Sequence, residues 1–221
     1  MKEVFKNVYH VGDSGCSVFV VNTEGDDGFV LIDAGMNSNM ISKQMKKTGL
    51  NPGNIKHCIL THCHIDHIAA CNDIKSFNKN IKFYAHELDA DAIERKGYDN
   101  KTVASWYGIN YVPIDLELKF TQEKEVLKLG AYEFECHHIP GHTPGSIAVF
   151  IIIDNTKILF GQDIHGPFNK SFGSNLNDYQ TSMQKLLDLS ADILCEGHFG
   201  IISPANEVEK YIRGYMRSNL P

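Results

Sequence analysis

The chain has 221 residues, of which 43% are hydrophobic, and this length and composition suit one compact domain with a substantial core. A formal net charge of −6 and the lack of a Lys/Arg cluster argue against a nucleic-acid-binding surface. The longest apolar run, Ile147 to Ile153, is too short to span a bilayer, and the start lacks the apolar core of a signal peptide, so we predict a cytoplasmic protein without a membrane or nucleic-acid partner.

The first half of the chain contains a pattern that returns later. The segment Val11-Gly12-Asp13-Ser14-Gly15-Cys16-Ser17 precedes an apolar strand, a turn over 25–28, and a second apolar strand that ends in Asp33. A helix-like stretch follows over 40–47, and a further short strand leads to Thr61. The pattern predicts a strand pair, then a helix, then a strand.

A dense group of potential metal ligands comes directly after that last strand. The segment Thr61-His62-Cys63-His64-Ile65-Asp66-His67 holds three histidines and a carboxylate. A core would exclude most of these side chains, whereas neutral imidazole and carboxylate bind zinc, iron and manganese. Side chains alternate along a strand, so His62 and His64 should point to the same side. A helix beginning near residue 65 would direct Asp66 and His67 toward the same space, and one corner would then serve two adjacent ions.

The segment from about 91 to 120 interrupts the repeat, and we predict an insertion there. It holds the one tryptophan, Trp106, together with Tyr98, Tyr107 and Tyr111. Packed on the edge of the fold, it would be an ordinary helix and loop. As a wall or lid of a substrate pocket, it would offer aromatic rings and a hydroxyl donor, and Tyr107 would then bind substrate. Both interpretations stay open.

The second half repeats the order of the first and adds three more potential ligands. His142 lies in the turn-rich segment 140–146, Asp163 follows the strand of 157–160, and His198 follows the strand of 192–194. A helix-like stretch over 179–189 separates the last two. Two similar halves predict two sheets packed face to face with helices outside, within a single domain over 1–221.

His165 and the six cysteines have less specific patterns. His165 lies two residues after Asp163 and, in an extended chain, would face the same side at the mouth of the pocket. A role in contacting substrate or moving a proton competes there with that of a plain rim residue. The cysteines lie in or beside apolar strands, which is typical of buried thiols rather than disulfides.

The order His-x-His-x-Asp-His, then His142, Asp163 and His198, resembles the metallo-β-lactamase superfamily of dinuclear hydrolases. The resemblance extends from Val8 to about Gly200, and all five motifs of the superfamily are matched. It implies an α/β fold of the four-layer αββα sandwich type.

The resemblance also implies a role for each motif residue. It places His62, His64 and His142 on a first metal, and it places Asp66, His67 and His198 on a second, with Asp163 bridging the two. Asp33 matches the first motif, in which it holds the ligand loops by hydrogen bonds. The implied cofactors are two divalent transition-metal ions, with zinc favoured over iron or manganese.

Two positions and the end of the chain indicate a branch of the superfamily. Diiron electron-transfer members commonly carry Glu where this chain has His64, and some true β-lactamases carry Cys where it has Asp163. The pattern is most similar to glyoxalase II and its hydrolase relatives. Glyoxalase II normally adds a helical C-terminal domain, whereas only one helix over 206–217 is predicted after His198, so we do not expect glutathione specificity.

The predicted function is hydrolysis of an ester, thioester, lactone or lactam by a metal-bridging hydroxide. Asp66 would bind the second metal and orient the hydroxide, which makes it the predicted catalytic residue. Two alternatives remain: an iron-dependent oxygenase like the persulfide dioxygenases of the superfamily, with one metal, and a protein that binds metal without turnover. The predicted partner is a small-molecule substrate, and the oligomeric state is left open.

Overall fold

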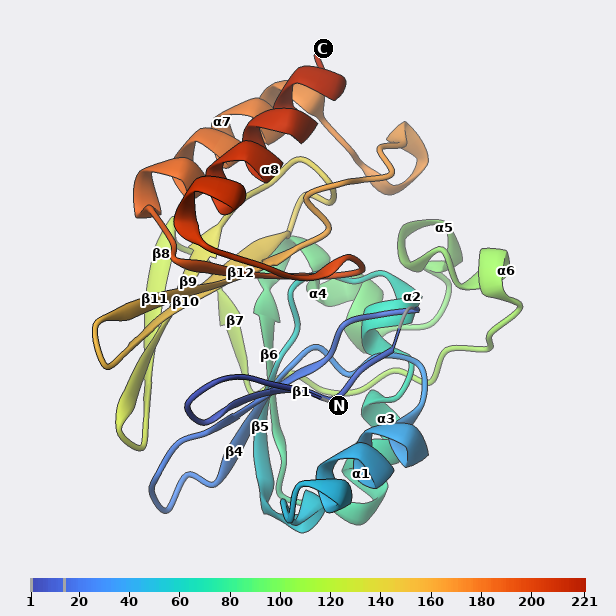
Figure 1. The fold of residues 1–221 in the computed structure, drawn as a ribbon. Coiled ribbons are helices and arrows are strands. Elements are labelled where there is room, and N and C mark those ends of the chain that lie inside the picture. Colours follow the sequence, from blue (N-terminus) through green and yellow to red (C-terminus); the bar gives the residue numbers. More distant parts are fainter. Residues whose placement is uncertain (1, 14) are drawn as a thin grey trace.

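The computed structural model describes residues 2–13 and 15–221, so Ser14 of the predicted repeat lies outside the described part of the chain. Within that part, the strands form two sheets that pack face to face, and helices cover both outer faces (Figure 1). The predicted α/β fold, a four-layer αββα sandwich, is confirmed.

The first sheet is antiparallel at one end and parallel at the other. Pairing is antiparallel from β1 to β4 and parallel from β4 to β7. In spatial order its strands are β1 (Lys2–Phe5), β2 (Val8–His10), β3 (Phe19–Asn22), β4 (Phe29–Ile32), β5 (Ile55–Ile59), β6 (Lys82–His86) and β7 (Leu118–Phe120).

The second sheet is antiparallel except for one parallel pair, β11 with β12. In spatial order its strands are β13 (Gly200–Ile202), β12 (Ile193–Glu196), β11 (Thr156–Gln162), β10 (Ile147–Ile153), β9 (Tyr132–His138) and β8 (Lys124–Leu129).

Helices connect the parallel strands and cover the outer faces. Helices α1 and α3 lie on the outer side of the first sheet, and α7 and α8 lie on the outer side of the second (Figure 1). The α-helices are α1 (Ser38–Lys47), α2 (Ile65–Ile68), α3 (Cys71–Phe77), α4 (Glu87–Glu94), α5 (Asp99–Thr102), α6 (Ala104–Tyr107), α7 (Leu176–Leu189) and α8 (Ala205–Ser218), and two short 3₁₀ turns, η1 (Pro52–Asn54) and η2 (Lys170–Phe172), accompany them.

Alternation along the strands produces three apolar layers. In the first sheet, Val20 and Leu31 face outward and pack with Ile41 of α1. Their neighbours Val21 and Val30 face inward and pack with strands of the second sheet. In that sheet the outward residues form a third cluster with α7 and α8. Because both faces of each sheet are buried, the central strands read as continuous apolar runs rather than as alternating ones.

The two halves have matching topology. In each, an antiparallel pair (β3 with β4, and β10 with β11) is followed by a helix and then by a strand parallel to the second member of the pair (β5, and β12). The predicted helices over 40–47, 179–189 and 206–217 correspond to α1, α7 and α8. The observed helices extend one to three residues beyond the predicted ranges. A parallel pair brings carboxyl ends to one edge, and this places the loops after β4, β5, β11 and β12 together.

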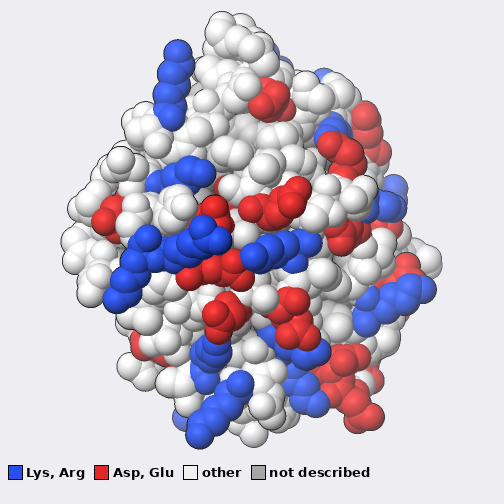
Figure 2. All heavy atoms as spheres, turned by 180° about the vertical axis from the view of Figure 1, so that it is seen from behind, with Lys and Arg blue, Asp and Glu red and all other residues white. Residues whose placement is uncertain are grey.

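The surface opposite the view of Figure 1 shows no single sign of charge. Basic and acidic side chains are interspersed on that face (Figure 2). Among the helices of residues 2–13 and 15–221, none has the length and apolar character needed to cross a membrane.

Candidate metal centre

The corner after β5 has the geometry that the ligand pattern predicts. His62 and His64 follow the end of β5, and Asp66 and His67 lie in the first turn of α2. All four side chains are buried although they are polar. The backbone amide of Asp33 donates to the carbonyl of Ile59, which ties the loop after β4 to the end of β5 at 2.9 Å.

Loops from the second sheet complete two groups of ligand atoms at this corner. In each group the candidate atoms lie within 4.8 Å of one another. The first group consists of His62, His64, His142 and Asp163, and the second of Asp66, His67, Asp163 and His198. The tertiary structure therefore brings together all seven residues that the sequence motifs predict as ligands.

Asp163 belongs to both groups and presents one oxygen to each. Its Oδ2 lies 3.4 Å from His142 Nε2 and 3.8 Å from His62 Nε2. Its Oδ1 lies 3.3 Å from the Nε2 atoms of both His67 and His198. Gly197 makes this approach possible, since a Cβ at that position would collide with Asp163 Oδ1.

The spacing and the unsatisfied atoms both suit metal ions. Four ligands bound tetrahedrally at about 2.0–2.1 Å lie about 3.3 Å apart, and the distances from Asp163 fall around this value. The buried atoms His62 Nε2, His64 Nε2 and Asp163 Oδ1 lack a hydrogen-bond partner within the described chain. Buried polar atoms without partners are costly, and a cation at each group would satisfy them.

The histidines of the first group are in the form that binds metal. Burial lowers the pKa of His62 and of His64 well below the usual histidine value, and neighbouring histidines lower both further. Burial likewise lowers the pKa of His142, to about 4. All three are therefore neutral at pH 7, as coordination requires.

The second group is dominated by its carboxylates. Burial disfavours the protonated form of His198, but contacts with Asp163 and Asp66 outweigh it and raise the pKa of His198 to about 9. The pKa of His67 is also raised despite burial, with Asp163 and Asp33 among the causes. A cation that binds this group must displace protons from both histidines, since only neutral imidazole coordinates.

Hydrogen bonds to the Nδ1 atoms, which point away from the site, orient the rings of His67 and His142. Asp33 Oδ2 accepts from His67 Nδ1 at 2.8 Å, and the two oxygens of Asp33 also accept from the Thr61 amide and hydroxyl. His142 Nδ1 lies 2.9 Å from the carbonyl of Pro167. In both cases the Nε2 atom is left to face the site, an arrangement that is usual for metal-binding histidines.

Comparisons with known proteins agree with this geometry. The model of the metallo-β-lactamase superfamily matches residues 11–198. The chain is 31% identical to hydroxyacylglutathione hydrolase GloC of Haemophilus influenzae over 74% of this chain and 76% of that protein. It is 25% identical to acyl-coenzyme A thioesterase MBLAC2 of Gallus gallus over 86% of this chain and 75% of that protein. A solved B3 metallo-β-lactamase with an active-site glutamic acid superposes with a TM-score of 0.81 at 22% identity, covering 99% of this chain and 89% of that one.

The chain belongs to the metallo-β-lactamase superfamily. It is thus a metal-dependent hydrolase, and the predicted resemblance is confirmed. The His/Asp groups are the candidate site for divalent metal in this superfamily fold.

Asp89, in α4, joins two of the ligand loops, and sequence reasoning did not single it out. Its carboxylate accepts from the Cys63 amide at 3.1 Å, the Thr143 hydroxyl at 2.7 Å and the Gly145 amide at 2.9 Å. Gly145 must lack a side chain, because its Cβ would lie 2.6 Å from Asp89. The sequence offered one signal for Asp89: it is an acidic residue just after β6, the parallel neighbour of β5, and the carboxyl ends of parallel strands lie at the same edge of a sheet.

Glu196 was also missed, and it explains the position of His165. Glu196 is fully buried and accepts from the amides of His198 and Phe199, each at 2.8 Å. Its other oxygen lies 2.8 Å from His165 Nδ1. The ring of His165 lies 5.1 Å from that of His198 between centroids. His165 is thus beside the second ligand group.

The segment over 91–120 reaches the site through its aromatic residues. Tyr107, in α6, donates from its hydroxyl to Asp66 Oδ2 at 3.4 Å. The ring centroid of Trp106 lies 6.0 Å from that of Phe172, which in turn lies 4.5 Å from that of His64. At the end of the segment, β7 pairs with β6 in the first sheet.

The six cysteines are buried and free, as predicted. Cys16 approaches the second ligand group, with its Sγ 3.6 Å from His67 Nδ1.

Proposed function

We propose that the protein is a dinuclear hydrolase that cleaves an ester, thioester, lactone or lactam of a small molecule. The observation that carries this proposal is the position of Asp163, whose two oxygens face two separate groups of imidazole and carboxylate ligands. One ion per group would place two cations side by side with a shared carboxylate between them. The names of two relatives, a hydroxyacylglutathione hydrolase and an acyl-coenzyme A thioesterase, support a thioester among these substrates.

Each predicted ligand has a defined task in this proposal. His62, His64 and His142 would hold one ion, and Asp66, His67 and His198 the other. Asp33 would keep His67 oriented, because its carboxylate fixes Nδ1 as the donor. The carboxylates of Asp163 and Asp66 would offset part of the repulsion between two cations. Zinc suits this nitrogen and oxygen set, and iron or manganese would also fit it.

Two divalent ions in such a site supply an activated water near neutral pH and polarise the bond that is cleaved. Asp66 is the proposed catalytic residue, since its Oδ2 lies 3.3 Å from His198 Nε2 and also accepts from Tyr107. Tyr107, which contacts Asp66, and His165, which lies beside His198, are the proposed substrate contacts. We further propose that both repeated halves act as a single domain, because each supplies ligands to both groups.

The proposal is tested by elemental analysis of the purified protein together with a hydrolysis panel on the same sample. We expect close to two transition-metal ions per chain and turnover of at least one substrate class. In Asp66→Asn the shape is kept and the charge is lost, so kcat/KM should fall on the order of 10²-fold, or about 2.7 kcal/mol. Metal content is measured alongside, and Asp91→Asn, an exposed change in α4, is the control.

Three results would contradict the proposal in different ways. A single ion that is insensitive to substitution of Asp66 or His198 excludes the dinuclear site. Oxygen uptake with sulfane-sulfur substrates, on an iron-loaded protein that hydrolyses nothing, identifies the iron oxygenase instead. Full metal loading without any turnover identifies a protein that binds metal without catalysis.

A further inference from the structure

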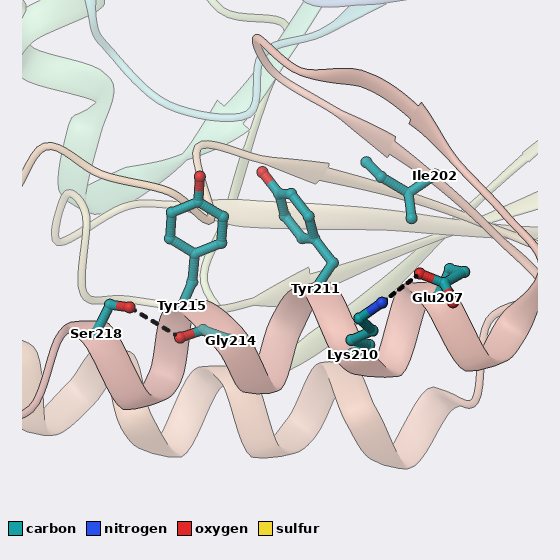
Figure 3. A pocket seen from close by; sticks show the side chains of 7 residues that line it. All are labelled: Ile202, Glu207, Lys210, Tyr211, Gly214, Tyr215 and Ser218. Atoms are coloured by element: carbon teal, nitrogen blue, oxygen red, sulfur yellow. Dashed lines mark hydrogen bonds and ion pairs between the residues drawn. The ribbon is translucent and has the colours of Figure 1, made fainter.

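A groove of about 590 Å³ runs along α8 on the outer side of the second sheet. Tyr211 and Tyr215, one turn apart on the helix, stand side by side in it, with their hydroxyls at the end away from the helix (Figure 3). Their ring centroids are 4.8 Å apart. The lining consists of Ile202, Glu207, Lys210, Tyr211, Gly214, Tyr215 and Ser218.

A series of neighbouring rings, packed edge-on or tilted, connects this groove to the candidate metal centre. The ring of Tyr215 lies 6.4 Å from that of His165 and 6.5 Å from that of Phe199. His165 in turn lies 5.1 Å from His198, a member of the second ligand group. Glu196 holds this connection in place, because it bonds to His165 and to the amides of His198 and Phe199.

The groove offers apolar surface without net charge. Glu207 and Lys210 are its charged lining residues, and they pair with each other at 3.2 Å (Figure 3). Burial and the nearby Glu196 raise the pKa of Tyr211, so its phenol is neutral at pH 7. Phe199 extends the aromatic surface toward the metal centre and is 59% exposed, although a ring of this size gains by burial.

We propose that this groove is a substrate subsite that takes an uncharged apolar group attached to the bond that is cleaved. The inference rests on the proposed hydrolase function and narrows its substrate class. The apolar group belongs either to the acyl part of the substrate or to its leaving group. A charged group would find no unpaired opposite charge among the described residues that line the groove.

Gly214 lines the groove, so a larger side chain at this position would fill it. A Cβ at Gly214 meets no atom within 4 Å, so a larger side chain there would enter open space. Leu is also a better helix former than Gly, so Gly214→Leu should fold. The matched control is Arg213→Leu, which places the same side chain at the preceding residue, where the exposed Arg213 pairs with Glu209 rather than lining the groove.

The experiment compares two series of uncharged thioesters. One lengthens the acyl chain from acetyl to octanoyl on N-acetylcysteamine, and the other lengthens the thiol from ethanethiol to octanethiol on an acetyl group. In the native protein, one series should gain in kcat/KM by up to about fourfold per buried methylene, and the series that gains identifies the source of the group. Gly214→Leu should reduce the ratio of longest to shortest substrate at least tenfold, and Arg213→Leu should keep it. An equal ratio in all three proteins overturns the subsite.

Binding of an amide that is not cleaved separates this inference from the proposed function. Saturation-transfer NMR of octanamide with the native protein should show contact with the alkyl chain, and Gly214→Leu should abolish it while Arg213→Leu keeps it. If no ester, thioester, lactone or lactam of the hydrolysis panel is cleaved but this pattern of binding is seen, the hydrolase proposal fails and the subsite stands. If octanamide binds none of the proteins, or all equally, the subsite is wrong even when hydrolysis is observed.

Discussion

Asp163 is the residue on which both candidate metal groups depend. Its two oxygens face opposite sides, and each lies within 3.4 Å of a histidine Nε2 of its own group. The remaining ligands each belong to one group. A change at Asp163 should therefore act on both ions, whereas a change at His62 should act mainly on one.

Substitution of Asp163 provides the first prediction. Asp163→Ala should reduce the bound metal at both groups, because each loses its shared anionic ligand. His62→Ala should weaken the first group more than the second. Metal per chain is measured by elemental analysis after dialysis against a series of chelator concentrations. Loss from one group alone in Asp163→Ala would show that this carboxylate does not bridge.

At the scale of elements, Asp89 connects α4 to the loops that carry His64 and His142. Three buried donors point at its carboxylate, from Cys63, Thr143 and Gly145. Two of these donors lie in the loop between β9 and β10 and the third in the corner after β5. Asp89 therefore links a loop of the first sheet to a loop of the second sheet at the edge where the site lies.

Removal of the Asp89 carboxylate should lower the stability of the fold substantially. Asp89→Ala removes the shared acceptor of three buried donors, and we expect the free energy of unfolding to fall by about 3–5 kcal/mol. Asp91→Ala, on the same helix, removes an exposed pair with Arg95 and should cost less than about 1 kcal/mol. Urea unfolding of the metal-free proteins measures both. Similar small losses in the two variants would mean that Asp89 does not hold the loops.

His86 is the capping residue at the start of α4. Its ring stacks on that of His138 with centroids 3.8 Å apart, and its Nδ1 accepts from the Leu88 amide at the helix start. Burial, and then the neighbouring His138, lower the pKa of His86 to about 4. In the unfolded chain the pKa is about 6.5, so between these values the unfolded state binds more protons.

The native protein should therefore lose stability as the pH falls from about 6.5 to about 4, with His86 responsible for roughly 2 kcal/mol. His86→Asn keeps a good capping residue and removes the titration, so its stability should fall less over this range. Chemical unfolding of metal-free protein at several pH values measures the difference. Parallel curves for the two proteins would contradict the assignment.

At the scale of the whole molecule, three apolar layers hold the two sheets and their covering helices together. The central layer lies between the sheets, and the two outer layers lie under α1 with α3 and under α7 with α8. The ligand groups lie at one edge, where loops meet. Metal should therefore stabilise the folded state without being needed to form it.

Chelation should lower the melting temperature by about 10 °C, because ions that bind only the native state contribute about 4 kcal/mol at a thousandfold excess over their dissociation constant. The chelated protein should keep its near-ultraviolet circular dichroism and a cooperative transition. Differential scanning calorimetry with and without chelator measures the shift. Loss of the cooperative transition would show that the sandwich needs its metals to fold.

The sequence by itself determined the layers and the ligand chemistry. Apolar runs predicted the buried strands, and the repeated strand–strand–helix–strand order predicted two matching halves, because periodicity is a local property of the chain. The ligand cluster from His62 to His67 could be recognised for the same reason, because its ligands are close in sequence and the loop between β5 and α2 is short. His142, Asp163 and His198 were legible as polar residues placed where strands end.

Only the tertiary structure decided what these residues meet. The bond between Asp89 and Gly145 joins positions 56 residues apart, and the contact of His67 with His198 joins positions 131 apart. No local pattern marks Glu196 as the partner of His165, or α8 as the wall of a groove beside the site. Such pairings arise from how two sheets pack and where their parallel strands end. That packing is a balance of many apolar contacts over the whole chain, and no single segment encodes it.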